Sequence, residues 1–403
     1  MKNPAIAFIL ILCLSCTSKE TKSNKAAGKY MTEIKGTAEN LKIEVNKDIL
    51  KTKTKLSDFC DSLWYVILDS KKESMFGEMS KIIVNDKYIL IADYSISKAV
   101  FIFDLNGKFI NKISKLGKGP FEYMRIADVC YWAQTNTIFI FDGDNRKIIE
   151  YDITGKPLRE IALTFWARNM AILDYNNFVF YAGFRENEHL KYNLIYVNNK
   201  GEIIKKGFPI DSRLPTEYAK NNPFNYLGNQ LCFAPDYDRN SYNVDQDAVS
   251  YRYKIDFLRK NIPDDFYYNK TSDENDIEIS KNKYAYVNEQ FESENYFFAN
   301  VIDESTNILQ FIYSKKEKEG CLFYSTINDI PNSFINPFFI GNVGDVFYSK
   351  VETELLLMIK NDLIAKKNTL PKKNKLIDMF LNYNETDNPI LAFYRIKFPK
   401  NTK

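Results

Sequence analysis

The sequence predicts an all-β fold, a six-bladed β-propeller with four-stranded antiparallel blades, on three observations. Hydrophobic residues make up 45% and aromatic residues 15% of the chain, and the many Ile, Val, Tyr and Phe residues favour strands and supply a large core. Glycine is scarce, with 15 residues, so each glycine is expected to hold a specific backbone position. The third observation is a repeat of about 47 residues, which is the length of a propeller blade.

Three hairpins carry this repeat and align without gaps around a turn glycine. The glycines are Gly107, Gly155 and Gly201, spaced by 48 and 46 residues. An Asp or Asn stands three residues before each glycine, where its side chain can bond to the turn backbone, and glycine supplies the positive φ of a tight turn. A further strand is expected ahead of each hairpin, at residues 88–93, 137–142 and 177–182, and another ahead of that one.

Looser units complete the predicted ring at residues 229–257, 283–327 and from 334 to 359. Residues 363–382 are interpreted as an insertion with a short helix, and residues 389–398 as a returning strand. The early strand at residues 64–68 is left over, and we expect it to pair beside the last unit and close the ring without free edges. A seven-bladed ring is the alternative.

The N-terminus predicts export and a lipid anchor. Met1 and Lys2 form a basic start, and an apolar run too short to span a bilayer ends at Cys13-Leu14-Ser15-Cys16. This ending resembles a bacterial lipobox, although Cys13 stands where Leu is usual. We therefore expect a signal peptide at 1–15, lipidation of Cys16, a flexible tether at 16–40 and the propeller domain at 41–403. An ordinary signal peptide with incidental cysteines is the alternative.

Charge and cysteine usage narrow the classes of partner. Lys and Arg number 55 against 52 Asp and Glu, and the charges are interspersed, so no nucleic-acid partner is expected. Membrane contact is expected only through the N-terminal lipid, which would make the protein an outer-membrane lipoprotein on the periplasmic or cell-surface side. Cys60, Cys130, Cys232 and Cys321 are far apart, and we interpret them as buried free thiols, with one disulfide left open.

One heptapeptide resembles a known family. Gly117-Lys-Gly-Pro-Phe-Glu-Tyr123 is similar to the G-x-G-P-x-E-Y motif of six-bladed β-propeller lipoproteins of Gram-negative anaerobes, which are distantly related to NHL-repeat propellers. Weaker matches are Leu56-Ser57-Asp58 and the ending Asp387-Asn-Pro-Ile-Leu391. The resemblance implies a propeller fold and an envelope location, and it transfers no catalytic motif.

The sequence shows no catalytic apparatus, and no cofactor is expected. His189 is the only histidine, so every His-dependent triad or zinc site would need that residue. Asp236, Asp238, Asp245 and Asp247 share a region without the glycine and terminal Glu of an EF-hand, which makes a loop Ca²⁺ site a weak candidate. The alternative to a non-enzymatic protein is a propeller hydrolase or lyase with a carboxylate-bound metal in the central channel.

Topology selects one rim of the propeller as the candidate site, because the inter-blade connections and the middle hairpins of the blades lie on the same side. The rim candidates are Lys118, Glu122, Tyr123 and Arg125 from the first connection, Trp166 and Arg168 from the second, and Arg146, Arg185 and His189 from middle hairpins. This basic and aromatic set suits an anionic or carbohydrate ligand, whereas a solvated rim with a buried Trp is the alternative. We expect a lipid-anchored binding or scaffolding module for a carbohydrate, peptide or protein partner. A structural subunit of an outer-membrane uptake complex is the third possibility.

Overall fold

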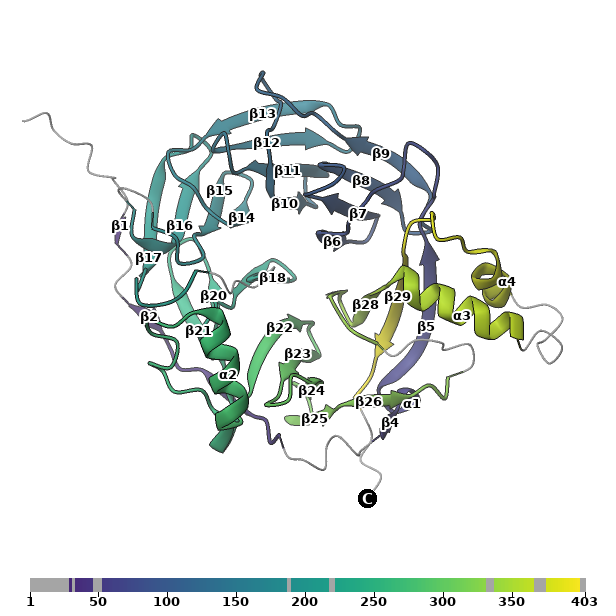
Figure 1. Ribbon diagram of the computed structural model, residues 1–403. Coiled ribbons are helices and arrows are strands. Elements are labelled where there is room, and N and C mark those ends of the chain that lie inside the picture. Colours follow the sequence, from purple (N-terminus) through teal and green to yellow (C-terminus); the bar gives the residue numbers. More distant parts are fainter. Residues whose placement is uncertain are drawn as a thin grey trace, which may run out of the picture.

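A ring of six four-stranded antiparallel blades surrounds a central axis in the computed structural model (Figure 1). The structure describes residues 29–30, 33–45, 53–186, 190–216, 222–330, 337–365 and 375–398. The six-bladed prediction is therefore confirmed. Within each blade the first strand lies nearest the axis and the fourth strand lies at the outside.

The first two blades follow the repeat of the sequence closely. Blade 1 consists of β6 (Lys81–Val84), β7 (Tyr88–Asp93), β8 (Ala99–Asp104) and β9 (Phe109–Ile113). Blade 2 consists of β10 (Ile126–Trp132), β11 (Thr137–Asp142), β12 (Lys147–Asp152) and β13 (Pro157–Ala162). Facing apolar side chains from both blades form one buried cluster, which includes Leu90 and Ile102 of blade 1 with Ile138 and Ile140 of blade 2. Stacking of blades thus buries surface that one sheet cannot bury alone.

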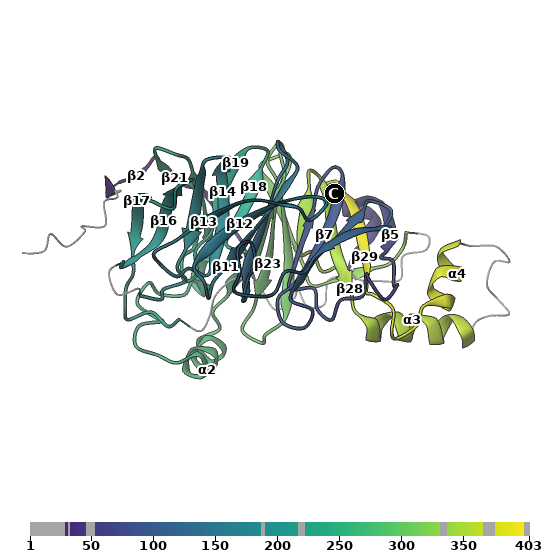
Figure 2. The ribbon, with the colours of Figure 1, turned by 90° about the horizontal axis from the view of Figure 1, so that it is seen from above.

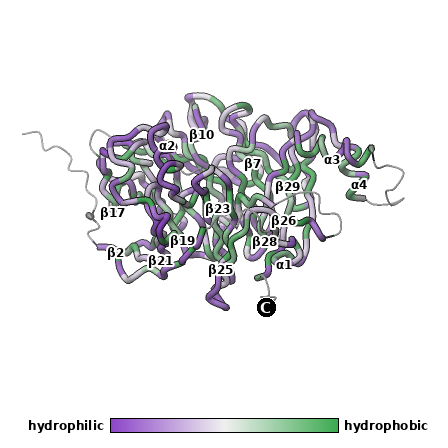
Figure 3. The backbone as a smooth tube through the Cα atoms, turned by 60° about the horizontal axis from the view of Figure 1, so that its bottom comes forward, coloured by the Kyte–Doolittle hydropathy of each residue, from purple (hydrophilic) through white to green (hydrophobic). Residues whose placement is uncertain are grey.

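Blades 3 to 5 continue around the ring. Blade 3 consists of β14 (Asn169–Asp174), β15 (Asn177–Tyr181), β16 (Tyr192–Asn198) and β17 (Ile203–Pro209). Blade 4 consists of β18 (Phe224–Leu227), β19 (Gln230–Phe233), β20 (Asn240–Val244) and β21 (Val249–Asp256). Blade 5 consists of β22 (Tyr286–Glu292), β23 (Tyr296–Ile302), β24 (Ile308–Ser314) and β25 (Glu319–Phe323). Hydrophobic stretches are seen in the interior of the ring, as around β23 and β28 (Val346–Val351), whereas the hairpin beside β25 is hydrophilic (Figure 3).

The repeated hairpin turn has the predicted hydrogen bonds. Asp104 Oδ1 accepts bonds from the backbone N–H groups of Asn106 and Lys108, both at 2.9 Å, and Gly107 adopts a φ of +84°. Asp152 and Asn198 make the same pair of bonds in the next two blades. The side chain three residues before the glycine therefore defines the turn, as expected.

Residues from both ends of the chain close the ring. Blade 6 has the order β27 (Gly341–Val343), β28 (Val346–Val351), β29 (Ile390–Ile396) and β5 (Cys60–Ile67), so the early strand forms the outer edge of the last blade. Trp64 lies opposite Phe393 in this register. The prediction that the leftover strand pairs beside the last unit is confirmed.

The helical insertion is larger than predicted. Between β28 and β29 lie α3 (Thr353–Ala365) and α4 (Lys375–Asn382). Residues 353–359, which we had placed in the sixth strand unit, are therefore helical and that part of the prediction is wrong. Leu356, Ile359 and Leu363 are the buried residues of α3, and their spacing of three and four follows the period of a helix.

The N-terminal segment pairs with the outer strands of blades 3 and 4 and then with a short strand between blades 5 and 6. The strands β1 (Lys29–Tyr30), β2 (Ile34–Lys35) and β3 (Glu39–Lys42) pair in parallel with β17 and β21, and β4 (Lys53–Lys55) pairs with β26 (Ser325–Ile327). A short helix, α1 (Leu56–Phe59), then leads into β5. Within the predicted tether, residues 29–30 thus pair with blade 3, and residues 34–35 and 39–40 pair with blade 4. The predicted signal peptide and Cys16 lie outside the described residues.

The four cysteines of the propeller have free thiols. Cys60, Cys130 and Cys232 are buried, and Cys321 is half-buried. Burial raises the pKa of the Cys60, Cys130 and Cys232 thiols to about 12, so these groups stay protonated at neutral pH. The interpretation as buried free thiols therefore agrees with the structure.

Candidate functional site

The two sides of the ring differ in their loops. The middle hairpins and the connections between blades emerge on one side, which also carries α3, α4 and α2 (Ser272–Asn282), the helix of the connection from β21 to β22 (Figure 2). We call this side the helical rim. Eight of the nine sequence-predicted ligand-binding candidates are among the described residues, and all eight belong to its loops.

The heptapeptide of the first inter-blade connection, residues 117–123, forms hydrogen bonds with both blade 1 and blade 2. Tyr123 is fully buried, and its hydroxyl lies 2.9 Å from the carbonyl oxygen of Lys98 in blade 1. Glu122 accepts a bond from the N–H of Gly119 at 2.9 Å, and the N–H of Phe121 donates to Glu160 of blade 2 at 2.8 Å. Glu122 and Tyr123 thus hold the connection in place, while Lys118 is exposed.

Two contacts involve the remaining rim candidates. Arg125 forms an ion pair with Asp144 at 2.7 Å, and Arg146 is exposed. The guanidinium of Arg185 lies 5.0 Å from the ring centre of Trp166, a cation–π contact. His189 lies outside the described residues.

The stem of Arg168 packs on Gly183, where an added Cβ would be 3.1 Å from Arg168 Cδ. Among the predicted candidates, Trp166 and Arg185 contact each other through the cation–π pair. None of the eight described rim candidates lines either of two cavities, which have volumes of about 470 Å³ and about 10 Å³.

The larger cavity lies on the helical rim between blades 4 and 5 and has a volume of about 470 Å³. Its walls come from the middle hairpin of blade 4, the end of β21, the connection that contains α2, and the inner strand β22 of blade 5. This volume falls in the range of small-molecule sites. We call it the blade 4–5 cavity; the second cavity, of about 10 Å³, holds at most a water molecule.

Hydrogen bonds fix the blade 4 wall of this cavity. Asp236 is buried and accepts a bond from the hydroxyl of Tyr181 in blade 3 at 2.8 Å. Asp238 accepts bonds from the N–H of Asn240 at 2.8 Å and from the Tyr242 hydroxyl at 2.5 Å. Burial and the charge of Asp238 both raise the pKa of Tyr242, so this tyrosine remains a proton donor to the carboxylate. The hairpin is thus held rigidly in its shape.

Aromatic rings form much of the apolar surface. Tyr237 lies between Tyr267 and Phe184, with ring centres 4.7 Å and 5.3 Å away. Tyr286 and Phe257 also contribute to the lining.

The helix α2 supplies one polar wall. Thr271 and Glu274 form a capping box at its start, and its buried Ile279 packs with Ile262 and Phe266. Asp276, on the next turn, lines the cavity together with Ile279. Tyr286, from β22, also lines the cavity. Burial is the main cause of its raised pKa, and the negative charge of Asp276 contributes.

Carboxylates outnumber cations around the blade 4–5 cavity. The acidic residues in its lining are Asp236, Asp238, Asp264, Asp276 and Glu289, and the basic residues are Arg239 and Lys254. Arg239 lies 3.2 Å from Asp264 and is therefore partly neutralised. Across the described ranges no group of three or more His, Cys, Asp or Glu side chains is placed to hold a metal ion.

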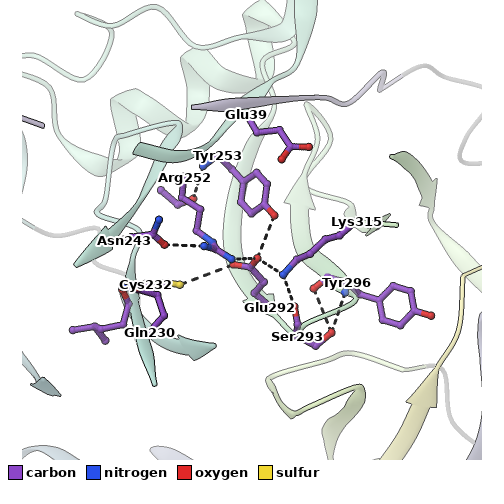
Figure 4. Close-up of polar contacts among 12 residues, drawn as sticks. Glu39, Gln230, Cys232, Asn243, Arg252, Tyr253, Glu292, Ser293, Tyr296 and Lys315 are labelled. Carbon is purple, nitrogen blue, oxygen red and sulfur yellow. Dashed lines mark hydrogen bonds and ion pairs between the residues drawn. The ribbon is translucent and has the colours of Figure 1, made fainter. Parts of the chain in front are cut away.

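A buried ion-pair network joins the same two blades farther along β22 (Figure 4). Glu292, at the end of β22, binds Arg252 of blade 4, with Nε 2.6 Å away, and also Lys315. The Tyr253 hydroxyl lies 3.2 Å from Glu292 Oε1. Arg252 also donates to Asn243 Oδ1 at 2.7 Å, so the network fixes β22 against blade 4.

Sequence reasoning missed the blade 4–5 cavity as a site. It considered Asp236 and Asp238 only as weak Ca²⁺ ligands and placed the ligand on the basic connections of blades 1 to 3. The length of one connection could have indicated the site, because the connection between β21 and β22 is much longer than the first two inter-blade connections. Long connections in compact domains are commonly functional.

The chain is similar to two solved structures over most of its length. A protein from Bacteroides fragilis described as exported has 19% identity, covers 90% of this chain and 100% of its own, and superposes with a TM-score of 0.70. A DUF4221 family member from Bacteroides vulgatus has 12% identity, covers 84% of this chain and 97% of its own, and has a TM-score of 0.51. Both show a shared fold. No curated protein matches the sequence.

A family model described as a domain of unknown function, DUF4934, matches residues 40–395, which include every blade of the ring. The chain therefore belongs to the DUF4934 family.

Proposed function

We propose that this protein is an exported, lipid-anchored binding module of the cell envelope, with the blade 4–5 cavity as its ligand site. One observation carries the proposal: a cavity of ligand size has polar side chains that are not used by the fold. The side chains of Asp276, Asn288 and Gln290 line it and make no hydrogen bond with the rest of the described protein. Such groups, beside aromatic walls, are what fixes the orientation of a bound small molecule.

Export is supported by two independent facts. The sequence starts with a basic and apolar segment that ends at Ser15-Cys16, and the similar protein of Bacteroides fragilis is described as exported. The structure has no helix, within its described residues, with the length and apolarity needed to span a bilayer. A lipid on Cys16 would supply the membrane attachment. The relation to NHL-repeat propellers remains a prediction from the heptapeptide.

The lining favours binding over chemistry. It contains no His, Ser or Cys residue, and Asp236 and Asp238 are engaged with Tyr181 and Tyr242. The hydrolase or lyase alternative requires carboxylates gathered around a metal in the central channel, and the described residues form no such group.

A blocked cavity tests the proposal. Asn288 is exposed on β22 and lines the cavity, so Asn288→Trp should fill part of it without disturbing the core. The full-length protein in detergent is screened by thermal shift against a panel of sugars, amines, amino acids and short peptides. A hit should lose its stabilising effect in Asn288→Trp and keep it in the control Gln134→Trp, an exposed residue of blade 2 far from the cavity. Equal stabilisation of both variants would reject this site.

A further inference from the structure

We infer that the ligand of the blade 4–5 cavity is an organic cation, an ammonium group on an apolar body, as in an aliphatic amine. This inference rests on the proposed function and adds the chemical class of the ligand. Three features of the cavity carry it: the balance of charge around it, the aromatic faces inside it, and a carboxylate that the fold leaves available.

The charge balance is local and opposite to that of the whole protein. The chain has a formal net charge of +3, whereas five carboxylates and two cations line the cavity. The connection that contains α2 continues this bias, because residues 261–280 include six Asp and Glu residues against one Lys. Clefts lined by one sign of charge concentrate ligands of the opposite sign. An anionic ligand would therefore be repelled from this entrance.

The two basic residues of the lining do not reverse this field. Arg239 is paired with Asp264, and Lys254 has an exposed side chain on the outer strand β21. The carboxylates come from three separate elements: the blade 4 hairpin, the α2 connection and β22. A cation inside the cavity would thus face negative charge from several directions.

Aromatic faces favour an ammonium group with an apolar body. Tyr237 and Tyr267 have ring centres 4.7 Å apart with planes inclined by 53°, so they form an angled wall rather than a flat stack. Tyr286 lines the cavity from β22. Ammonium ions bind over such ring faces through cation–π attraction, and this attraction grows when water is excluded.

Asp276 is the expected partner of the charged group. Its carboxylate makes no ion pair or hydrogen bond in the portion of the chain that the structure describes, whereas Asp236, Asp238 and Asp264 are each engaged. Asp276 and Tyr286 line the same cavity, and the charge of Asp276 contributes to the raised pKa of Tyr286, so an ammonium group bound to Asp276 would share the cavity with this aromatic ring. A charge-assisted hydrogen bond to this carboxylate would then give the ligand its orientation.

A matched set of probes tests the charge requirement. Cadaverine, 1,5-pentanediol and glutarate share a five-carbon chain and carry cationic, neutral and anionic ends; benzyltrimethylammonium probes the aromatic wall, and maltose probes the carbohydrate alternative. Calorimetric titration of the full-length protein should show binding of the two cations, weaker at high salt, and no binding of glutarate.

Three variants locate the contact. Asp276→Asn should weaken cadaverine binding about tenfold to a hundredfold, the usual effect of losing a charge-assisted bond. The same change at Asp273, an exposed residue of α2 that does not line the cavity, should alter binding less than about twofold because only the diffuse field changes. Tyr286→Leu should weaken benzyltrimethylammonium binding, and equal melting temperatures would show that the variants remain folded.

The outcomes separate the two proposals. Binding of maltose or pentanediol that Asn288→Trp abolishes would overturn the cation inference and leave the binding function intact. Cation binding that is equally weakened by Asp273→Asn and Asp276→Asn would overturn the assigned contact. Cation binding unaffected by Asn288→Trp would overturn both the inference and the proposed site.

Discussion

Alanine in place of the three hairpin glycines should destabilise the protein to different extents, although the glycines occupy equivalent turns. Gly107, Gly155 and Gly201 have φ values of +84°, +80° and +79°, so the backbone strain of an alanine is the same at each. Their surroundings differ. A Cβ on Gly107 would lie 1.8 Å from the carbonyl oxygen of Ile67, and one on Gly201 would lie 1.9 Å from that of Ala162.

Gly155 is the internal control of this series. The nearest atom to its added Cβ would be Asn111 Nδ2 at 3.0 Å, the end of a flexible side chain. A left-handed backbone conformation costs a non-glycine residue about 1 to 2 kcal/mol, which is the expected loss for Gly155→Ala. Displacing a strand carbonyl of the neighbouring blade adds about 1 to 3 kcal/mol, so Gly107→Ala and Gly201→Ala should each cost about 2 to 5 kcal/mol.

Urea denaturation followed by tryptophan fluorescence and by circular dichroism measures these differences. The midpoints should fall in all three variants, with Gly155→Ala nearest to the parent protein and with unchanged slopes. Equal losses for the three variants would show that turn strain alone matters and that the hairpins do not pack tightly on the preceding blade. A larger loss for Gly155→Ala would refute the reasoning outright.

Four further results follow from contacts and from the sequence. Burial alone would raise the pKa of Asp93, but hydrogen bonds from the backbone N–H groups of Ser97, Ile96 and Gly77 outweigh it and lower this pKa. The ionised carboxylate therefore stabilises the fold at neutral pH, and this stabilisation is lost as the pH falls through the lowered pKa. Asp93→Asn should destabilise the protein far more at pH 7 than at pH 2 in urea titrations. Glu292→Gln should cost about 3 kcal/mol because it leaves two cations without their carboxylate, whereas the exposed Glu294→Gln should cost almost nothing in the same assay. Removal of residues from Pro389 onward deletes β29 and should abolish cooperative unfolding, and an unchanged melting temperature would contradict ring closure. Cys16→Ala should move the protein from the membrane to the soluble fraction, and retention through an alkaline wash would argue against a lipid anchor.

The fold could be predicted because the repeat depends on short-range chemistry. The turns at Gly107, Gly155 and Gly201 are specified by four or five consecutive residues, and the structure reproduces the expected side-chain bonds. Strand bounds at residues 88–93 and 137–142 were predicted to the residue for the same reason, since each strand ends at an Asp that caps the neighbouring loops. These two aspartates, Asp93 and Asp142, are structural, and their repeated position was visible in the sequence.

The helix α3 shows where local patterning misleads. Its sequence Leu355-Leu356-Leu357-Met358-Ile359 is apolar on all sides, which suits a buried strand as well as a helix. Burial of Leu356, Ile359 and Leu363 against blade 6 decides the conformation, and that contact involves residues distant in sequence.

The blade 4–5 cavity could not be derived from the repeat, because it exists where the repeat is broken. The first inter-blade connection packs against both of the blades that it joins, through Tyr123 on Lys98 of blade 1 and Phe121 on Glu160 of blade 2, and these polar groups are used in that packing. The long connection after β21 instead leaves β22 uncovered along residues 286–290 and stands α2 beside it. Glu292 then holds β22 against blade 4 at the far end of the same strand, so the cavity has one rigid wall in blade 5 and one in the Asp236 to Asn240 hairpin. Only the α2 wall rests on a small apolar contact, through Ile262, Phe266 and Ile279. If the cavity changes shape when a ligand binds, this helix is the wall that should move, and its amide exchange should slow on binding while that of β22 stays constant.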